Sequence, residues 1–401
     1  MPGPMQGVRV VELGVWVAGP AAGGILADWG ADVVKIEPPG LGDPARGFSR
    51  MLGGDLPFNP PFEMDNRGKR SLVLDLGAPE GRELARSLVA GADVFVSNLR
   101  QAALRRLGLD PATLLARHPR LVYAAITGYG LEGPDADRAA YDIAAFWARA
   151  GIALALTPPG GTPPFQRGGM GDHGVGMCAA AAVSAALFAR ERTGQGQLVS
   201  TSLLRQGIYT LSFDLAVTLR FGLGIQAGDR RRIPNPATNC YRDREGRWFW
   251  IVGLEGERHW PPLARAAGHP EWLTDPRFAG PAERAKNAEE LIRLLDDVFA
   301  ARTREEWAEV FDAEEDLWWA PVQTLDEVVN DPQVRAGGGL VDVPDGPATT
   351  TLPATPCDFH GTPWAPRTMA PGLGQHSDEI LGELGLGAGE IAKLRERGVV
   401  A

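Results

Sequence analysis

Short apolar runs alternate with segments of helical spacing through the first half of the chain. Six runs rich in Val, Ile, Leu and Ala predict buried strands at residues 8–13, 31–37, 71–75, 93–96, 121–127 and 197–200. Helical spacing occurs between them, at 21–29, 81–90, 104–107, 111–117 and 175–192. Strands that alternate with helices are typical of a parallel sheet with right-handed crossovers. The pattern predicts an α/β fold, in which 42–66 is a long surface loop.

The pattern changes near residue 225, after a predicted helix at 202–221. An Arg- and Pro-rich linker leads into an aromatic hairpin at 241–251, followed by helices and then a return to loops and strands. We expect the tryptophans around the hairpin to fill a core. The chain divides into the N-terminal part of a large domain, a linker helix, a small inserted α+β domain and a return linker with the C-terminal part of the large domain, at 1–200, 201–227, 228–320 and 321–401.

Composition narrows the class of protein further. The formal net charge of −10 argues against a broad nucleic-acid surface. The three cysteines are far apart and lack metal-ligand spacing, so we expect reduced thiols, no metal and a cytoplasmic location. Cys178, one turn into the long helix, is expected to be a core residue. No signal pattern and no apolar run of transmembrane length stands out, so we expect no membrane partner.

The most informative stretch is the glycine cluster at 168–174, which holds Asp172 at the start of the long helix. Asp is a common N-cap residue, which gives Asp172 a purely structural interpretation. The alternative is a reactive carboxylate at the positive end of the helix dipole, where glycines let another molecule approach. Asp142, before an apolar helical stretch, is likewise either an N-cap or a second carboxylate of the same site.

Basic residues concentrate in the first third of this acidic chain, at Arg67, Lys69, Arg70, Arg100, Arg105 and Arg106. They are either solvated surface charges or a pocket for a multiply anionic ligand, since Arg matches phosphate oxygens. Asn98 follows the fourth predicted strand directly, where open α/β sheets bind ligands.

Several segments together resemble the class III CoA-transferases of the CaiB/BaiF type, a family that also includes α-methylacyl-CoA racemases. They are residues 7–37, NRGKRSLVL at 66–74, 92–107, 121–134, the Gly171-Asp172 pair, TGQGQ at 193–197 and DPRF at 275–278. The resemblance implies a Rossmann-like large domain with a small inserted domain and an interlocked homodimer. It implies acyl-CoA and a small carboxylic acid as substrates, with no tightly bound cofactor.

The resemblance makes Asp172 the nucleophile that attacks the acyl-CoA thioester, with Asp142 in support. Gly169 and Gly171 become candidate oxyanion and clearance positions. The candidate CoA contacts are Val17, Ala18, Lys69, Arg70, Asn98, Arg100, Ala103 and Arg106. Two alternatives stay open: a racemase, which would need histidine where Tyr141 precedes Asp142, and a CoA-binding protein without activity.

Overall fold

The computed structural model describes residues 3–51, 54, 56–224 and 227–401. The chain forms two compact units. The first comprises Met1–Leu154, Pro164–Gly224 and Arg335–Ala401, and the second comprises Ala155–Pro163 and Ile225–Val334. The small domain expected at 228–320 therefore falls within the second unit, and its boundaries stay a prediction.

The first unit is built on a six-stranded sheet in the order β3-β2-β1-β4-β5-β6. All neighbouring strands run parallel. The order is that of the doubly wound Rossmann sheet, and it confirms the predicted α/β class. Each strand begins and ends within two residues of its predicted bounds: β1 (Arg9–Leu13), β2 (Asp32–Glu37), β3 (Arg70–Val73), β4 (Val94–Ser97), β5 (Val122–Thr127) and β6 (Leu198–Ser202).

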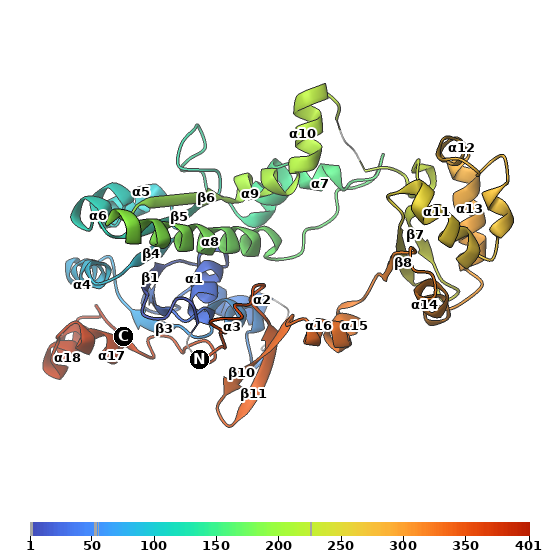
Figure 1. Ribbon diagram of the computed structural model, residues 1–401. Helices are drawn as coiled ribbons and strands as arrows, with labels where there is room; N and C mark the ends of the chain where they lie inside the picture. The colour runs from blue at the N-terminus through green and yellow to red at the C-terminus, as the bar shows by residue number, and fades with distance from the viewer. Residues whose placement is uncertain (1–2, 52–53, 55, 225–226) are drawn as a thin grey trace. The chain divides into compact units, whose positions relative to one another are not determined.

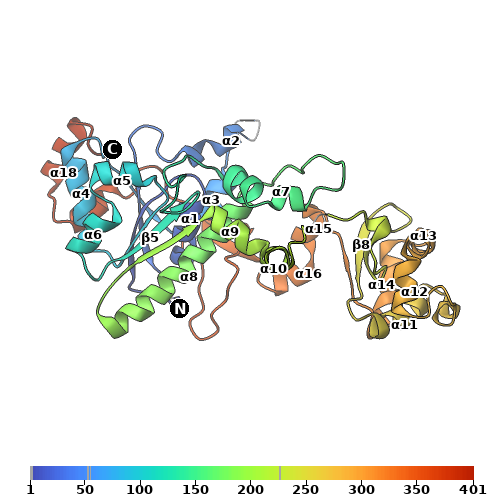
Figure 2. The same ribbon diagram turned by 90° about the horizontal axis from the view of Figure 1, so that it is seen from above.

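Alternate residues of these strands enter two separate hydrophobic clusters, one on each face of the sheet. One face is covered by α1 (Ala18–Asp28) and α8 (Met170–Thr193), as Figures 1 and 2 show. The other face is covered by five helices: α4 (Pro79–Ala90), α5 (Gln101–Leu107), α6 (Pro111–Arg117), α17 (Ser377–Glu383) and α18 (Ala388–Glu396). The C-terminal helices thus complete the core that the N-terminal strands begin.

The long helix α8 packs closely on α1. A Cβ on Gly176 would lie 2.8 Å from the Cβ of Ala21, so only glycine allows this approach. The buried residues Val175, Ala179 and Val183 repeat every fourth position and form the inner stripe. By length and composition α8 could span a membrane, which corrects the expectation that no apolar run is long enough. Core helices pass the same test, and the buried stripe of α8 faces α1 and the sheet.

Three local predictions for the first unit were wrong. The segment 42–66 contains η1 (Pro44–Gly47), α2 (Phe48–Met51) and α3 (Pro60–Asn66), because Asp43 and Asn59 cap turns that have no apolar periodicity. The helix expected at 202–221 breaks at Leu211 into α9 (Leu203–Thr210) and α10 (Ser212–Phe221). Cys178 is exposed on α8, since it faces away from the inner stripe. This unit also contains η2 (Ile143–Arg149) and the β10 (Leu340–Asp345)–β11 (Ala348–Pro353) hairpin, and α7 (Ile152–Ala155) ends at its boundary.

The second unit has its own antiparallel sheet of β7 (Thr238–Arg242), β8 (Trp248–Val252) and β9 (Trp319–Pro321). The β7–β8 pair confirms the predicted aromatic hairpin. Helical elements complete the unit: η3 (Arg230–Arg232), α11 (Gly256–Ala266), η4 (Pro270–Leu273), α12 (Pro281–Lys286), α13 (Ala288–Phe299), α14 (Arg304–Asp312) and α15 (Leu325–Asn330), with α16 (Pro332–Ala336) at the boundary. Trp260 is buried as expected, but Trp250 and Trp318 are 42% and 44% exposed and do not fill the core.

Candidate active site

A small cavity lies at the carboxyl edge of the parallel sheet. Its volume is about 110 Å³, and its walls come from the loops after β1, β4 and β5 and from the first turn of α8. Since parallel strands end at the same edge, residues far apart in the chain meet there. The cavity lining includes Trp16, Ala18, Asn98, Tyr141, Asp142 and Asp172.

Asp172 is not the N-cap of α8. The helix begins five residues earlier than predicted, and Gly169 occupies the N-cap position with a left-handed φ of 76°. Asp172 therefore lies in the first turn. Its side chain accepts no hydrogen bond from the residues that the structure describes, so the structural interpretation as a cap is wrong.

Asp142 provides the cap instead, across 29 residues of sequence. Its Oδ2 accepts hydrogen bonds from the N–H groups of Gly171 at 2.9 Å and Asp172 at 3.3 Å. Asp142 precedes η2 as expected, yet its side chain makes no capping bond to that helix. Because this buried carboxylate accepts the N–H groups of Gly171 and Asp172, the side chain of Asp172 is not needed as a cap for its own helix.

The surroundings of Asp172 oppose its ionisation. Burial first, and then the neighbouring carboxylates of Asp142 and Asp65, raise the pKa of Asp172 from 3.8 to about 7, while His173 acts in the opposite direction. The Nε2 of His173 lies 3.1 Å from Oδ1 of Asp65, and this hydrogen bond raises the pKa of His173. The helix dipole, which favours the charged form, therefore does not set the pKa of Asp172, and its carboxyl ionises near neutral pH.

Comparison with known protein families shows to which family the chain belongs. The sequence profile of CoA-transferase family III matches residues 5–377. The chain belongs to this family. The family is that of the class III CoA-transferases, and the match confirms the CaiB/BaiF-type resemblance.

The similarity to individual family III members extends from end to end. The (R)-2-hydroxy-4-methylpentanoate CoA-transferase of Clostridioides difficile is 30% identical over 399 residues, which cover 99% of this chain and 99% of that protein. The cinnamoyl-CoA:phenyllactate CoA-transferase of Clostridium sporogenes is 32% identical, covering 98% of this chain and 96% of that protein. A CAIB/BAIF family protein from Brucella suis has a crystal structure that matches with a TM-score of 0.82 at 31% identity, covering 96% of this chain and all of that one.

Gly169 and Gly171, on either side of Met170, differ in whether their backbone N–H groups are available to a ligand. The N–H of Gly171 is already donated to Asp142, so it is not available to an oxyanion. A Cβ on Gly171 would lie 2.2 Å from Oδ1 of Asp142, so its clearance serves the cap rather than a ligand. At Gly169 a Cβ would meet the ring of His173 at 2.9 Å. Gly169 stays the candidate donor, and Gly171 is assigned to the architecture of the site.

The candidate CoA contacts form two groups in the structure. Val17 is the N-cap residue of α1, Ala18 begins that helix, and Asn98 bonds both backbone groups of Val15. Ala103 lies on α5. Arg100 at the start of this helix and Arg106 in its last turn have exposed side chains. All of these follow β1 or β4, at the edge that holds Asp172.

Lys69 and Arg70 are committed to the protein itself. Lys69 is buried, and its Nζ lies 2.7 Å from Oε2 of Glu12 and donates to Oδ1 of Asn66. Arg70 bonds Asp32 on the neighbouring strand and two glutamates of α17. This packing argues against CoA contacts for both, and their assignment stays a prediction.

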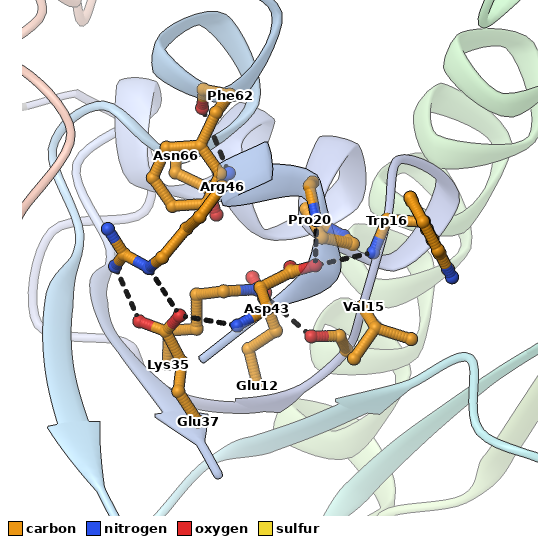
Figure 3. Close-up of polar contacts among 12 residues, drawn as sticks. Glu12, Val15, Trp16, Pro20, Lys35, Glu37, Asp43, Arg46, Phe62 and Asn66 are labelled. Carbon is orange, nitrogen blue, oxygen red and sulfur yellow. Dashed lines mark hydrogen bonds and ion pairs between the residues drawn. The ribbon is translucent and has the colours of Figure 1, made fainter. Parts of the chain in front are cut away.

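The predicted basic group therefore does not gather into one pocket. Arg67 pairs with the buried Asp28, and Arg105 pairs with Asp137 at 3.2 Å. The charges that sequence reasoning missed are Glu12, Lys35 and Asp43, which form a buried network below the loop after β1 (Figure 3). Glu12 and Lys35 are charged residues within largely apolar buried strands, which is the one sequence signal that could have indicated them. No group of three or more His, Cys, Asp or Glu suited to a metal occurs among the described residues.

Proposed function

We propose that this family III enzyme transfers CoA from an acyl-CoA to a carboxylic acid, with Asp172 as the nucleophile. The observation that carries the proposal is the different bonding of two neighbouring carboxylates. Asp142 accepts hydrogen bonds from two N–H groups in the first turn of α8. The side chain of Asp172 accepts none from the described residues and faces the cavity at the carboxyl edge of the sheet. A carboxylate without competing hydrogen bonds, partly removed from water, is a competent nucleophile.

The proposed reaction proceeds by covalent exchange at Asp172. A carboxylate oxygen of Asp172 attacks the thioester carbonyl, the C–S bond breaks, and CoA thiolate leaves behind a mixed anhydride. The thiolate then attacks the carbonyl carbon of Asp172, the anhydride C–O bond breaks, and the original acyl group departs as a carboxylate. The product on the enzyme is an aspartyl-CoA thioester.

The second half of the reaction reverses these steps with a different acid. The acceptor carboxylate attacks the aspartyl thioester, CoA thiolate leaves, and a new mixed anhydride forms. The thiolate attacks the acceptor's carbonyl carbon and releases the new acyl-CoA together with the Asp172 carboxylate. No net proton is consumed. The N–H of Gly169 is the proposed donor to the tetrahedral oxyanion, and the loops after β1 and β4, with Arg100 and Arg106, are proposed to hold CoA.

One observation keeps a racemase in view. A carboxyl whose pKa is about 7 is also suited to remove and return an α-proton. The experiment is incubation with an acyl-CoA in D₂O without an acceptor acid. Transfer chemistry gives a hydroxylamine-sensitive CoA adduct and no α-deuterium, and proton transfer gives deuterium without an adduct.

The matched variants for this experiment are Asp172→Asn and Asp378→Asn. The first removes the nucleophile with little change in shape, and the second removes an exposed carboxylate on α17. We expect CoA transfer to fall at least about 10³-fold in Asp172→Asn and to persist in Asp378→Asn. Unchanged transfer in Asp172→Asn would refute the proposal. Binding of CoA without transfer in the wild type would favour a non-catalytic CoA-binding protein.

The proposed assembly is the homodimer that the family resemblance implies. None of the residues of α10 is buried, and apolar side chains on α9 and α10 are exposed to between 46% and 85%: Ile208, Tyr209, Phe213, Leu219 and Phe221. A groove of about 700 Å³ between these helices and α8 adds to this surface. Exposed apolar surface of this extent is typical of protein interfaces. Analytical ultracentrifugation of wild type and Leu219→Asp tests the assembly, and a wild-type monomer would contradict it.

A further inference from the structure

The residue Trp16 has an unusual backbone conformation beside the cavity. Its φ is +63°, and it is the single non-glycine residue with a positive φ among those that the structure describes. Bulky residues avoid this region because Cβ crowds the backbone. Such outliers persist where the surroundings enforce them, often at functional sites.

Two side chains enforce the conformation of Trp16 from either side. Its N–H donates to Oδ1 of Asp43 at 2.9 Å. The preceding residue, Val15, is held at its N–H and its carbonyl by the side-chain amide of Asn98, at 2.9 and 2.7 Å. The loop is therefore fixed by groups from two distant parts of the chain.

Asp43 is in turn fixed by buried charge. Its Oδ2 lies 2.8 Å from the Nζ of Lys35, which also bonds Oε1 of Glu12 and the carbonyl of Gly14. Figure 3 shows Asp43 between this ammonium and the backbone of Trp16. A buried ion network has one good geometry, so it holds the loop after β1 rigidly.

The rigid loop presents the indole of Trp16 to the cavity of Asp172. The ring of Tyr141 meets it edge-on, at a centroid distance of 5.9 Å and an interplanar angle of 83°. Phe48 packs against the indole at 5.7 Å. The cavity-lining residues include two carboxylates and no Lys, Arg or His. The rings of Trp16 and Tyr141 form an aromatic wall next to the nucleophile, and the neighbouring His173 pairs with Asp65 and does not line the cavity.

We propose that Trp16 is a specificity-determining residue, whose indole, with the ring of Tyr141, selects an aromatic or flat apolar acyl group beside Asp172. This inference rests on the proposed function, because it names the substrate class of the same site. An edge-to-face pair of rings leaves apolar surface that an aryl group can extend. A dicarboxylic acyl group would bring a third negative charge to an acidic cavity and is disfavoured.

The test compares two thioesters that differ by one ring, 3-phenylpropanoyl-CoA and propanoyl-CoA, with succinyl-CoA as the charged probe. Each is assayed for kcat/KM with one fixed acceptor acid. In the wild type we expect a preference of at least about tenfold for the aryl thioester, the value of one good aromatic contact. Trp16→Gly should reduce this preference about tenfold, since glycine adopts φ +63° freely and only the ring is lost. Trp16→Phe should retain most of it.

Two control variants separate the effect of the aromatic wall, the rings of Trp16 and Tyr141, from a general loss of folding. Tyr141→Ala removes the second ring without touching the strained loop and should reduce the preference in the same direction, so the test survives if Trp16→Gly does not fold. Phe188→Ala removes an exposed ring from the far half of α8 and should leave the preference unchanged.

The outcomes distinguish this inference from the proposed function. An adduct on Asp172 without an aryl preference, or a preference that survives in both wall variants, overturns the role of Trp16 alone. Preferred use of succinyl-CoA overturns it as well. Failure of every thioester to form an adduct overturns the proposed nucleophile.

Discussion

Replacing Asp142 by asparagine separates two effects of that carboxylate on Asp172. The amide oxygen of asparagine can still accept the N–H of Gly171, so the cap on α8 is retained. The other carboxylate oxygen, Oδ1, is buried without a hydrogen-bond partner among the described residues, so the new amide nitrogen loses no bond there. What changes is the negative charge beside Asp172.

The size of the effect follows from the geometry. Oδ2 of Asp142 lies 3.3 Å from the backbone nitrogen of Asp172, so the two carboxyl groups are neighbours. At roughly 6 Å and an effective dielectric constant of about 20, two unit charges repel by about 2.8 kcal/mol, or about two pKa units. The pKa of Asp172 should fall from about 7 toward about 5 in Asp142→Asn and stay above 3.8, because burial is the larger cause of its elevation.

The assay is kcat/KM for one acyl-CoA donor across pH 5 to 9, which reports the ionisation of the free enzyme. Activity requires the carboxylate, so the rate rises with pH through the pKa of Asp172. We expect the midpoint to move to lower pH in Asp142→Asn and to stay in place in Asp378→Asn. A midpoint that is unchanged, or that moves to higher pH, would refute the electrostatic coupling of the two carboxylates.

Three further predictions follow from other contacts of the site. His173 lowers the pKa of Asp172, so His173→Gln should move the same pH–rate midpoint upward, and a downward shift would contradict this assignment. Gly171→Ala places a Cβ 2.3 Å from Phe146 and should lower the free energy of unfolding in denaturant by about 1–3 kcal/mol. The control Gly382→Ala places its Cβ in open space and should leave that free energy unchanged or raise it by up to about 1 kcal/mol. Lys35→Met leaves the buried carboxylate of Asp43 without its cation and leaves Glu12 paired with Lys69 alone, and it should cost about 3–5 kcal/mol by the same measurement, whereas wild-type stability would show that the network does not hold the loop.

The ionisation of Asp172 also sets a stability trend. Its folded-state pKa lies above the ordinary value of 3.8, so the folded protein binds the proton more tightly than the unfolded chain. This group's contribution is therefore fully present below about pH 4 and is lost as pH rises through about 7. The charge that the proposed chemistry needs is the one that the fold disfavours.

The parallel sheet could be predicted from sequence because its strands are buried on both faces. Runs such as residues 8–13 and 121–127 have few polar positions, and that pattern needs no tertiary information. The segment 42–66 could not be predicted in this way, since its short helices depend on the capping side chains of Asp43 and Asn59. The break at Leu211 also has no signal in the helical pattern.

The site was harder to predict because long-range contacts decide the role of each residue. Asp172 and Asp142 were both identified, but local sequence rules treat each as the cap of its own helix, whereas Asp142 caps the helix of Asp172. Lys69 is of a residue type that often binds phosphate, but its buried ion pair with Glu12 becomes visible only in the folded chain. The positive φ of Trp16 likewise depends on Asp43 and Asn98, which are distant in sequence.

The central claim is that Asp172 forms a covalent bond to CoA during turnover. The most direct measurement is peptide mass spectrometry of the enzyme after incubation with an acyl-CoA, with and without hydroxylamine. We predict a CoA adduct on the peptide that contains Asp172, lost on hydroxylamine treatment and absent from Asp172→Asn. Efficient CoA transfer with no adduct on that peptide, or an adduct that persists in Asp172→Asn, would contradict the account.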